Sequence, residues 1–125
     1  MNENDISFDI RGAAFKVHSN LGPGLLESVY EVALAHELIK MGYEVKSQVG
    51  LPVIYDDIQM EMGFRIDLLV NDLVVVEIKS VEALADVHHK QLLTYLKLSG
   101  KKLGLLINFN VALLKEAIVR IVNNL

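Results

Sequence analysis

The sequence contains no cysteine. A chain without cysteine has no disulfide framework, no thiolate metal ligand and no thiol nucleophile, so any metal ion would be held by oxygen or imidazole groups. The sequence also lacks an apolar run of the roughly 20 residues that cross a bilayer. Its N-terminal segment, MNENDISFDI, is acidic and polar, unlike a signal peptide. These absences lead us to expect a cytoplasmic protein without a membrane partner.

Positive charge is scarce and unevenly distributed. The chain has 12 basic and 16 acidic residues, a formal net charge of −4, which argues against a protein that coats nucleic acid nonspecifically. Residues 1–78 carry 5 basic and 13 acidic side chains (−8), whereas residues 79–125 carry 7 basic and 3 acidic ones (+4). The second segment is compatible with either a solvated helix surface or a groove that follows phosphates. The lysines in question are Lys90, Lys97, Lys101 and Lys102.

The chain is rich in apolar residues, and its length limits how they can be arranged. A hydrophobic content of 52% supports a compact fold and excludes a disordered chain. With 125 residues the chain can bury a substantial core but is too short for two domains. We therefore expect residues 1–125 to form a single domain.

Two apolar, strand-like runs in the middle of the chain carry a small set of charges. FRIDLLV contains Asp67, and VVVEIK contains Glu77 and Lys79. Because side chains alternate along a strand, Glu77 and Lys79 share one face. The aliphatic residues at the alternate positions are expected to form the buried face of a hairpin that turns at Asn71 and Asp72. These aliphatic residues are Ile66, Leu68, Val70, Val74, Val76 and Ile78.

The length of the connecting loop decides whether the acidic side chains meet. With a two-residue loop Val70 would oppose Leu73, and Asp67 would point away from Glu77. With a three-residue loop Val70 opposes Val74, and Asp67 lies across from Glu77. We predict the three-residue loop, because Asn and Asp tolerate the left-handed conformation that such loops need and because this register gathers the charges on one face.

The acidic pair has two interpretations. Two carboxylates this close repel each other unless a cation or a proton lies between them, so Asp67 and Glu77 form a candidate divalent-metal site with Lys79 beside it. Alternatively, the charges lie on an ordinary solvent face, where Arg65 pairs with either acid in a surface ion pair of little energetic value. The spacing alone leaves both interpretations open.

Periodicity and turn residues outline the elements around this hairpin. Helices are predicted over residues 5–19, 25–41, 86–99 and 113–122. Strands are predicted over residues 43–49, 51–60 and 102–109, with a turn or bulge at Asp56 and Asp57. This order of elements indicates an α/β sandwich with a mixed sheet. The expected apolar stripe of the second helix consists of Leu26, Val29, Tyr30, Ala33, Leu34 and Ile39.

Polar residues recur at helical spacing on two of the predicted helices. Glu27 and Tyr30 share a face of the second helix, and a carboxylate in its first turn is favoured by the helix dipole alone. Gln91 and Tyr95 are four residues apart on the helix over residues 86–99, so their side chains are neighbours. A helix face packed on the sheet explains this second pair equally well.

The hairpin residues resemble a known catalytic motif. Asp67 and the sequence Glu77-Ile78-Lys79 are similar to the signature of the PD-(D/E)xK nuclease superfamily, although Ile66 occupies the position of the proline in that signature. The resemblance implies a restriction-endonuclease-like core, in which a mixed β-sheet is flanked by helices. Its expected order is two N-terminal helices, the hairpin strands, a helix, a strand and a C-terminal helix.

A second resemblance is to a smaller group within that superfamily, the GxxExxY proteins. The segment LGPGLLESVYE supplies Gly24, Glu27 and Tyr30 at the matching positions. FRIDLLV, VVVEIKS, QLLTYL and GLLINF are also similar to that group, so the resemblance extends over nearly the whole chain.

The resemblance implies a metal site and a set of catalytic residues. Mg²⁺, or Mn²⁺ in its place, would be bound by the metal ligands Glu27, Asp67, Glu77 and the backbone carbonyl of Ile78. The implied catalytic residues are Asp67, Glu77, Lys79, Gln91 and Tyr95. Lys79 would orient the attacking water or neutralise charge on the phosphate. Gln91 and Tyr95 would steady the site and the nucleic-acid backbone.

The first functional hypothesis is therefore a metal-dependent nuclease, a hydrolase with DNA as its expected substrate. The alternative is a noncatalytic nucleic-acid-binding or protein-interaction module that retains the nuclease fold. A third hypothesis is a metal-dependent phosphohydrolase that acts on a small nucleotide. Because a chain of this size has little surface for recognising a base sequence, a homodimer is expected to supply more of it.

Overall fold

The structure is a computed structural model that describes the backbone of residues 1–125 and the side chains of residues 1–60 and 63–125. Its elements follow the chain in the order α1 (Glu3–Leu21), α2 (Glu27–Lys40), β1 (Val45–Tyr55), β2 (Ile58–Val70), β3 (Val74–Lys79), α3 (Asp86–Ser99), β4 (Leu103–Asn108), the 3₁₀ turn η1 (Leu114–Glu116) and β5 (Ile118–Val122). The strands form one sheet in the order β1-β2-β3-β4-β5. Only β3 and β4 pair in parallel, so the sheet is mixed as predicted.

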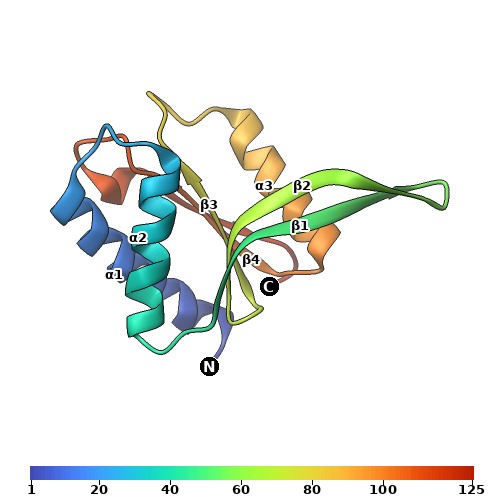
Figure 1. Cartoon of the computed structure of the whole chain (residues 1–125), viewed down its shortest axis with the longest axis horizontal. Helices are drawn as coiled ribbons and strands as arrows, with labels where there is room; N and C mark the ends of the chain where they lie inside the picture. Colours follow the sequence, from blue (N-terminus) through green and yellow to red (C-terminus); the bar gives the residue numbers. More distant parts are fainter.

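Helices cover both faces of this sheet. α1 and α2 pack on one face and α3 packs on the other (Figure 1). The central strand β3 contributes to both layers, because Val74 and Val76 belong to the core beneath α1 and α2 while Val75 belongs to the core beneath α3. Over the described residues, no helix combines the length and the apolar character needed to cross a membrane.

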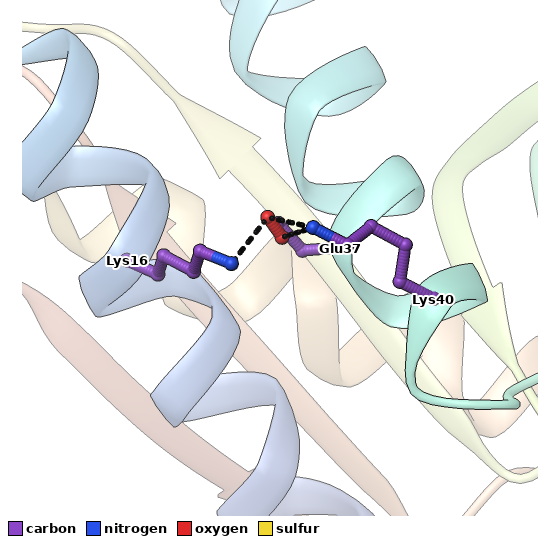
Figure 2. A network of polar contacts seen from close by, with 3 residues as sticks. All are labelled: Lys16, Glu37 and Lys40. Atoms are coloured by element: carbon purple, nitrogen blue, oxygen red, sulfur yellow. Dashed lines mark hydrogen bonds and ion pairs between the residues drawn. The ribbon is translucent and has the colours of Figure 1, made fainter.

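The two N-terminal helices are joined by a surface ion-pair network, in which the lysines are exposed and the glutamate is half-buried. The Glu37 carboxylate of α2 lies 3.0 Å from the Lys16 ammonium of α1 and 3.3 Å from that of Lys40 (Figure 2). The hydrogen bond from Lys16 is the largest of the effects that hold the pKa of Glu37 below its ordinary value. The same hydrogen bond raises the pKa of Lys16. Exposed pairs of this kind contribute little to stability.

The apolar stripe predicted for α2 is partly wrong. Tyr30 and Leu34 are fully buried as expected, but Leu26, Val29 and Ile39 are exposed. Leu38, outside the predicted stripe, is buried instead. Tyr30, Leu34 and Leu38 are spaced by four residues, so the buried stripe of α2 is narrower than its apolar composition suggests.

The central hairpin has the predicted register. Val70 pairs with Val74 and Leu68 with Val76, which leaves the three-residue loop. Asn71 and Asp72 both adopt positive φ, at 51° and 56°, as the prediction required. One detail differs, because Ile66 is buried in the core beneath α3 and not in the core that contains Leu68 and Val70.

The strands β1 and β2 form a longer hairpin than predicted. Asp56 and Asp57 form the predicted turn, with φ angles of 51° and 63°, but β2 then runs without the predicted break from Ile58 to Val70. The tip of this β1–β2 hairpin extends beyond the sheet (Figure 1). Leu51 pairs with Phe64 where the register shifts, and a Cβ at the preceding Gly63 would collide with the Leu51 carbonyl oxygen.

The C-terminal helix predicted over residues 113–122 is wrong. This segment forms the short turn η1 and then β5, which pairs antiparallel with β4. The β-branched residues Ile118, Val119, Ile121 and Val122 favour a strand because their χ1 angles are restricted in a helix. Moreover, β5 provides hydrogen-bond partners for the backbone groups along the edge of β4. The periodicity of the sequence does not reveal that these groups need partners.

Candidate active site

The acidic pair lies where β2 and β3 stop pairing through their backbones. Leu68 and Val76 form the last backbone pair at this end of the hairpin. Beyond it, the Asp67 N–H donates to Glu77 Oε1 over 3.1 Å, and the Ile78 N–H donates to Asp67 Oδ2 over 2.8 Å. Each carboxylate therefore replaces a backbone acceptor of the neighbouring strand, and these crossed hydrogen bonds hold the two acids next to each other.

The environment of this pair disfavours two negative charges. Glu77 is 5% exposed. Its burial raises its pKa to about 8, and the charge of Asp67 adds to this shift. Burial also raises the pKa of the half-buried Asp67, although the hydrogen bond from the Ile78 N–H and the charge of Lys79 oppose the change. A cation or a proton between the carboxylates would relieve this unfavourable charge.

Lys79 supplies a positive charge at the end of β3. Its half-buried side chain lowers the pKa of both Asp67 and Glu77, but burial has the larger effect on each. The backbone around Lys79 is fixed, because its carbonyl accepts a hydrogen bond of 2.9 Å from the Phe109 N–H beyond β4. Lys79 therefore reduces the repulsion within the acidic pair without cancelling it.

Glu27 lies at the start of α2, and its contact is with the chain just after β3. Its Oε2 accepts a hydrogen bond of 3.0 Å from the Ser80 N–H, and the Ser80 hydroxyl donates to the Leu25 carbonyl over 2.6 Å. The charge of Glu27 contributes to the raised pKa of Asp67. Ser80 thus ties the N-terminus of α2 to the end of β3 that carries the acidic pair.

The glycine and tyrosine of the GxxExxY segment shape the turn before Glu27. Gly24 has a φ of 94°, a conformation that glycine adopts without strain. The Tyr30 hydroxyl donates to the Gly22 carbonyl over 2.6 Å and accepts from the Leu25 N–H over 3.1 Å. Its ring stacks on Phe109 with 4.5 Å between the centroids. These contacts anchor the turn from which Glu27 projects.

α3 borders the acidic pair on the face of the sheet opposite α1 and α2, the face that Glu77 shares with Val75. Tyr95 is buried, and its ring lies 5.2 Å from that of Phe64. Burial raises the pKa of Tyr95 to about 12, and the charges of Glu77 and Asp67 add to the shift, so its hydroxyl stays protonated at neutral pH. Gln91, one turn earlier on α3, is half-buried.

The composition of the pair fits a hard divalent cation. Among the side chains that the structure describes, no three His, Asp or Glu residues converge into one metal-holding group, so Glu27 does not complete a cluster with the pair. Asp67 and Glu77 offer two carboxylates, and the Ile78 carbonyl is the further oxygen ligand expected from the sequence. Mg²⁺ is commonly held by one or two carboxylates while it keeps several waters. The donors are therefore sufficient without a third acidic side chain.

Sequence analysis missed Gln48 of β1, which contacts Asp67, and Glu31 of α2, which contacts Gln48. The Gln48 amide donates to Glu31 Oε1 over 2.6 Å and to Asp67 Oδ1 over 3.4 Å. Neither residue stands out in the sequence, because Glu31 lies on an otherwise typical helix and Gln48 in a polar stretch. Only the pairing of β1 with β2 brings Gln48 across from Asp67.

A third missed residue, Asn108, could have been recognised from the sequence. Asn108 is a polar residue in the apolar run LGLLINF, and it is 1% exposed. Its Nδ2 donates to the Val81 carbonyl over 3.0 Å, and its Oδ1 accepts from the Val81 N–H over 3.1 Å. This two-point contact fixes the chain after β3 and thereby positions the Ser80 N–H that binds Glu27.

An α/β fold with a mixed sheet and an acidic pair at a strand end defines a class of nuclease-like proteins. The family model of the PD-(D/E)XK nuclease superfamily matches residues 4–121. The chain belongs to this superfamily, and its fold is restriction-endonuclease-like. Nucleases of this superfamily act on nucleic acid and generally use divalent metal ions. No curated protein and no solved structure matches the chain.

Proposed function

We propose that this protein is a Mg²⁺-dependent nuclease of the GxxExxY group that hydrolyses phosphodiester bonds in nucleic acid, with DNA as the expected substrate. The observation that carries the proposal is the pair of crossed hydrogen bonds between Asp67, Glu77 and Ile78. They hold two carboxylates together in a setting that raises both pKa values. Such perturbed groups are typical of functional sites.

Three groups are assigned to the metal ion. Asp67 and Glu77 would bind it through their carboxylates and Ile78 through its carbonyl, while Glu27 would lie at the edge of the site. When bound, Mg²⁺, or Mn²⁺ in its place, would polarise a phosphate oxygen and lower the pKa of a coordinated water. Before binding, burial and the neighbouring Asp67 favour a proton on Glu77, and the metal ion would take the place of that proton.

The remaining residues act on the substrate and not on the metal. The Lys79 ammonium would orient the attacking water and neutralise charge that develops on the phosphate. Tyr95 keeps its proton at neutral pH, so its hydroxyl is a hydrogen-bond donor for the nucleic-acid backbone. Gln91, on the same side of α3, would add a second contact to that backbone.

The proposal is tested with four proteins. Wild type, Asp67→Asn, Glu77→Gln and Lys79→Met are compared in calorimetric titrations with Mg²⁺ or Mn²⁺ and in cleavage of single- and double-stranded DNA and RNA. We expect wild type to bind metal and to cut, and the two carboxylate variants to lose both properties. Lys79→Met should cut at least about 100-fold more slowly. It should bind metal as tightly as wild type or tighter, because a positive neighbour is removed.

Matched controls lie elsewhere on the surface. Glu44→Gln and Lys102→Met remove an exposed acid and an exposed lysine outside the candidate site, and both variants should behave as wild type. A wild type that binds no divalent ion at millimolar concentration would overturn the nuclease proposal in favour of the noncatalytic module. Metal binding without cleavage of DNA or RNA would transfer the proposal to a small nucleotide substrate.

The assembly and the location of the protein are separate proposals. We propose a single domain that acts as a homodimer in the cytoplasm, and the homodimer rests on size alone. Light scattering at high protein concentration tests the dimer, and a mass that stays at one chain would exclude it.

A further inference from the structure

Gln48 has an unusual backbone conformation for its position. It lies within β1 yet has a φ of 55°. Ser47 pairs with Leu68 and Val49 with Ile66, so Gln48 stands directly across from Asp67. A side chain with a Cβ is strained in this left-handed region, and residues so held cluster at functional sites.

The other left-handed residues show why Gln48 is different. Asp56, Asp57, Asn71 and Asp72 also have positive φ and form hairpin turns that require this conformation, whereas Asn124 has positive φ next to the C-terminus, outside any strand. Asn and Asp adopt this conformation more readily than most other residues. Gln48 lies in no turn, and its longer side chain reaches across to other elements instead.

The side chain of Gln48 contacts two carboxylates. Its Nε2 lies 2.6 Å from Glu31 Oε1 on α2 and 3.4 Å from Asp67 Oδ1 on β2. Asp67 Oδ2 accepts from the Ile78 N–H, so each oxygen of the Asp67 carboxylate has its own donor. Two donors on different strands fix the plane of this carboxylate, whereas one donor would leave it free to rotate.

Glu31 fixes the amide in turn. Its bond to Gln48 is short and charge-assisted, and therefore stronger than the longer bond from Gln48 to Asp67. Glu31 is half-buried on α2, a helix held against the sheet by Tyr30 and Leu34. The chain from Glu31 through Gln48 to Asp67 therefore connects the acidic pair to a rigid helix.

We propose that Gln48 is a positioning residue that holds the Asp67 carboxylate in the orientation needed to bind a divalent cation, with Glu31 as its support. The left-handed backbone directs the amide toward Asp67, so the strain is retained for this contact. The inference rests on the proposed function for the cation, and it adds two residues to the site that do not touch the metal. Groups that orient metal ligands typically change metal affinity about 10- to 100-fold when removed.

The variant Gln48→Gly distinguishes the effect of the backbone conformation from the effect of the side chain. Glycine adopts the left-handed conformation without strain, so the metal-free variant should unfold about 3 °C higher than wild type. At the same time it should bind Mn²⁺ roughly tenfold more weakly, because the Asp67 carboxylate loses one donor. A residue with only a structural role would not give greater stability together with weaker binding.

The matched control is Asp57→Gly. Asp57 has a φ of 63° in the β1–β2 turn, away from the acidic pair, so glycine fits the backbone there and should leave Mn²⁺ affinity unchanged. Glu31→Ala provides a second variant. It should weaken Mn²⁺ binding less than Gln48→Gly does, because the amide remains but is no longer held.

Thermal unfolding without metal and Mn²⁺ calorimetry with the metal alone as probe give distinct outcomes. Weaker binding by a more stable Gln48→Gly, with Asp57→Gly unchanged in affinity, supports the inference. Unchanged Mn²⁺ affinity or lower stability in Gln48→Gly overturns the inference. The proposed function remains intact in that case if the wild type binds metal and cleaves nucleic acid. A wild type that binds no Mn²⁺ overturns the proposed function and this inference together.

Discussion

Glu37 and Glu77 are two acids of one chain in opposite surroundings. Glu37 lies between two lysines that join α1 to α2, and its pKa is lowered. Glu77 is buried against another carboxylate, and its pKa is raised to about 8. The first arrangement favours the charged carboxylate and thus the folded chain. The second disfavours it, so Glu77 keeps a proton near neutral pH, and a bound cation could take the place of that proton.

The largest effect should come from removing the charge of Glu77. Glu77→Gln keeps the shape of the side chain but removes a proposed metal ligand, so DNA cleavage should fall at least about 100-fold. The metal-free variant should nevertheless be more stable than wild type at pH 8, on the order of 2 kcal/mol, because a buried charge is gone. Cleavage assays and urea denaturation measure the two effects. If Glu77→Gln were both inactive and less stable than wild type, the surroundings of Glu77 would not disfavour its charge, and the contrast with Glu37 would be wrong.

The pH dependence of stability should differ between the two acids. The pKa of Glu77 in the folded protein is raised from 4.5 to about 8, so its contribution is fully present below pH 4.5 and is lost as the pH rises through 8. Urea denaturation at pH 5 and pH 8 should therefore show a larger loss of stability in wild type than in Glu77→Gln, by about 1 kcal/mol or more. Equal losses in the two proteins would contradict the raised pKa.

Glu37 should show the opposite sign. Its pKa is lowered, so its contribution is present above the ordinary pKa of a glutamate and is lost as the pH falls through the lowered value. The difference in stability between wild type and Glu37→Gln should accordingly shrink on acidification. Denaturation between pH 6 and pH 3 measures it, and a difference that grows in acid would count against the assigned ion pairs.

An intermediate effect is expected at Asn108. Asn108→Ala removes both hydrogen bonds to Val81, leaving a buried backbone N–H and carbonyl unpaired, which should cost about 2 kcal/mol. Because Val81 follows the Ser80 that binds Glu27, cleavage should also decrease, by less than in Glu77→Gln. Urea denaturation and DNA cleavage report both changes. If stability falls while cleavage stays at the wild-type level, Asn108 supports the fold without positioning the site.

The smallest effect is expected at Lys16. Lys16→Ala breaks one exposed ion pair and leaves Glu37 with Lys40, so stability should change little and cleavage not at all. The small change should diminish further in high salt, where exposed charges are screened. Urea denaturation at low and high salt tests this, and a large loss that persists in high salt would mean that Lys16 acts through packing.

Residues with strong local signals were predicted correctly from the sequence. Asn71 and Asp72 tolerate positive φ, so the loop length and the opposition of Asp67 to Glu77 followed from parity. Gly100 ends α3 in the left-handed conformation, and the predicted helix over residues 86–99 has the observed bounds. In both cases the controlling interaction is local in the chain.

What could not be predicted depends on long-range contacts. The last strand, Ile118–Val122, forms because β4 has an edge to be paired, whereas its apolar spacing also suits a helix. The narrow buried stripe of α2 depends on how closely α1 and the sheet approach it. Gln48 and Glu31 become neighbours of Asp67 only after β1 pairs with β2, so no spacing in the sequence could identify them.

The most direct test of the acidic pair is the number of protons released when metal binds. A carboxyl group with a pKa of about 8 is largely protonated at pH 7, so a metal ion that binds there must displace its proton. Calorimetric titration with Mg²⁺ in buffers of different ionisation enthalpy counts these protons. We predict a release of roughly one proton for wild type and no comparable release for Glu77→Gln. Mg²⁺ binding by wild type without proton release, or no binding at all, would contradict the account.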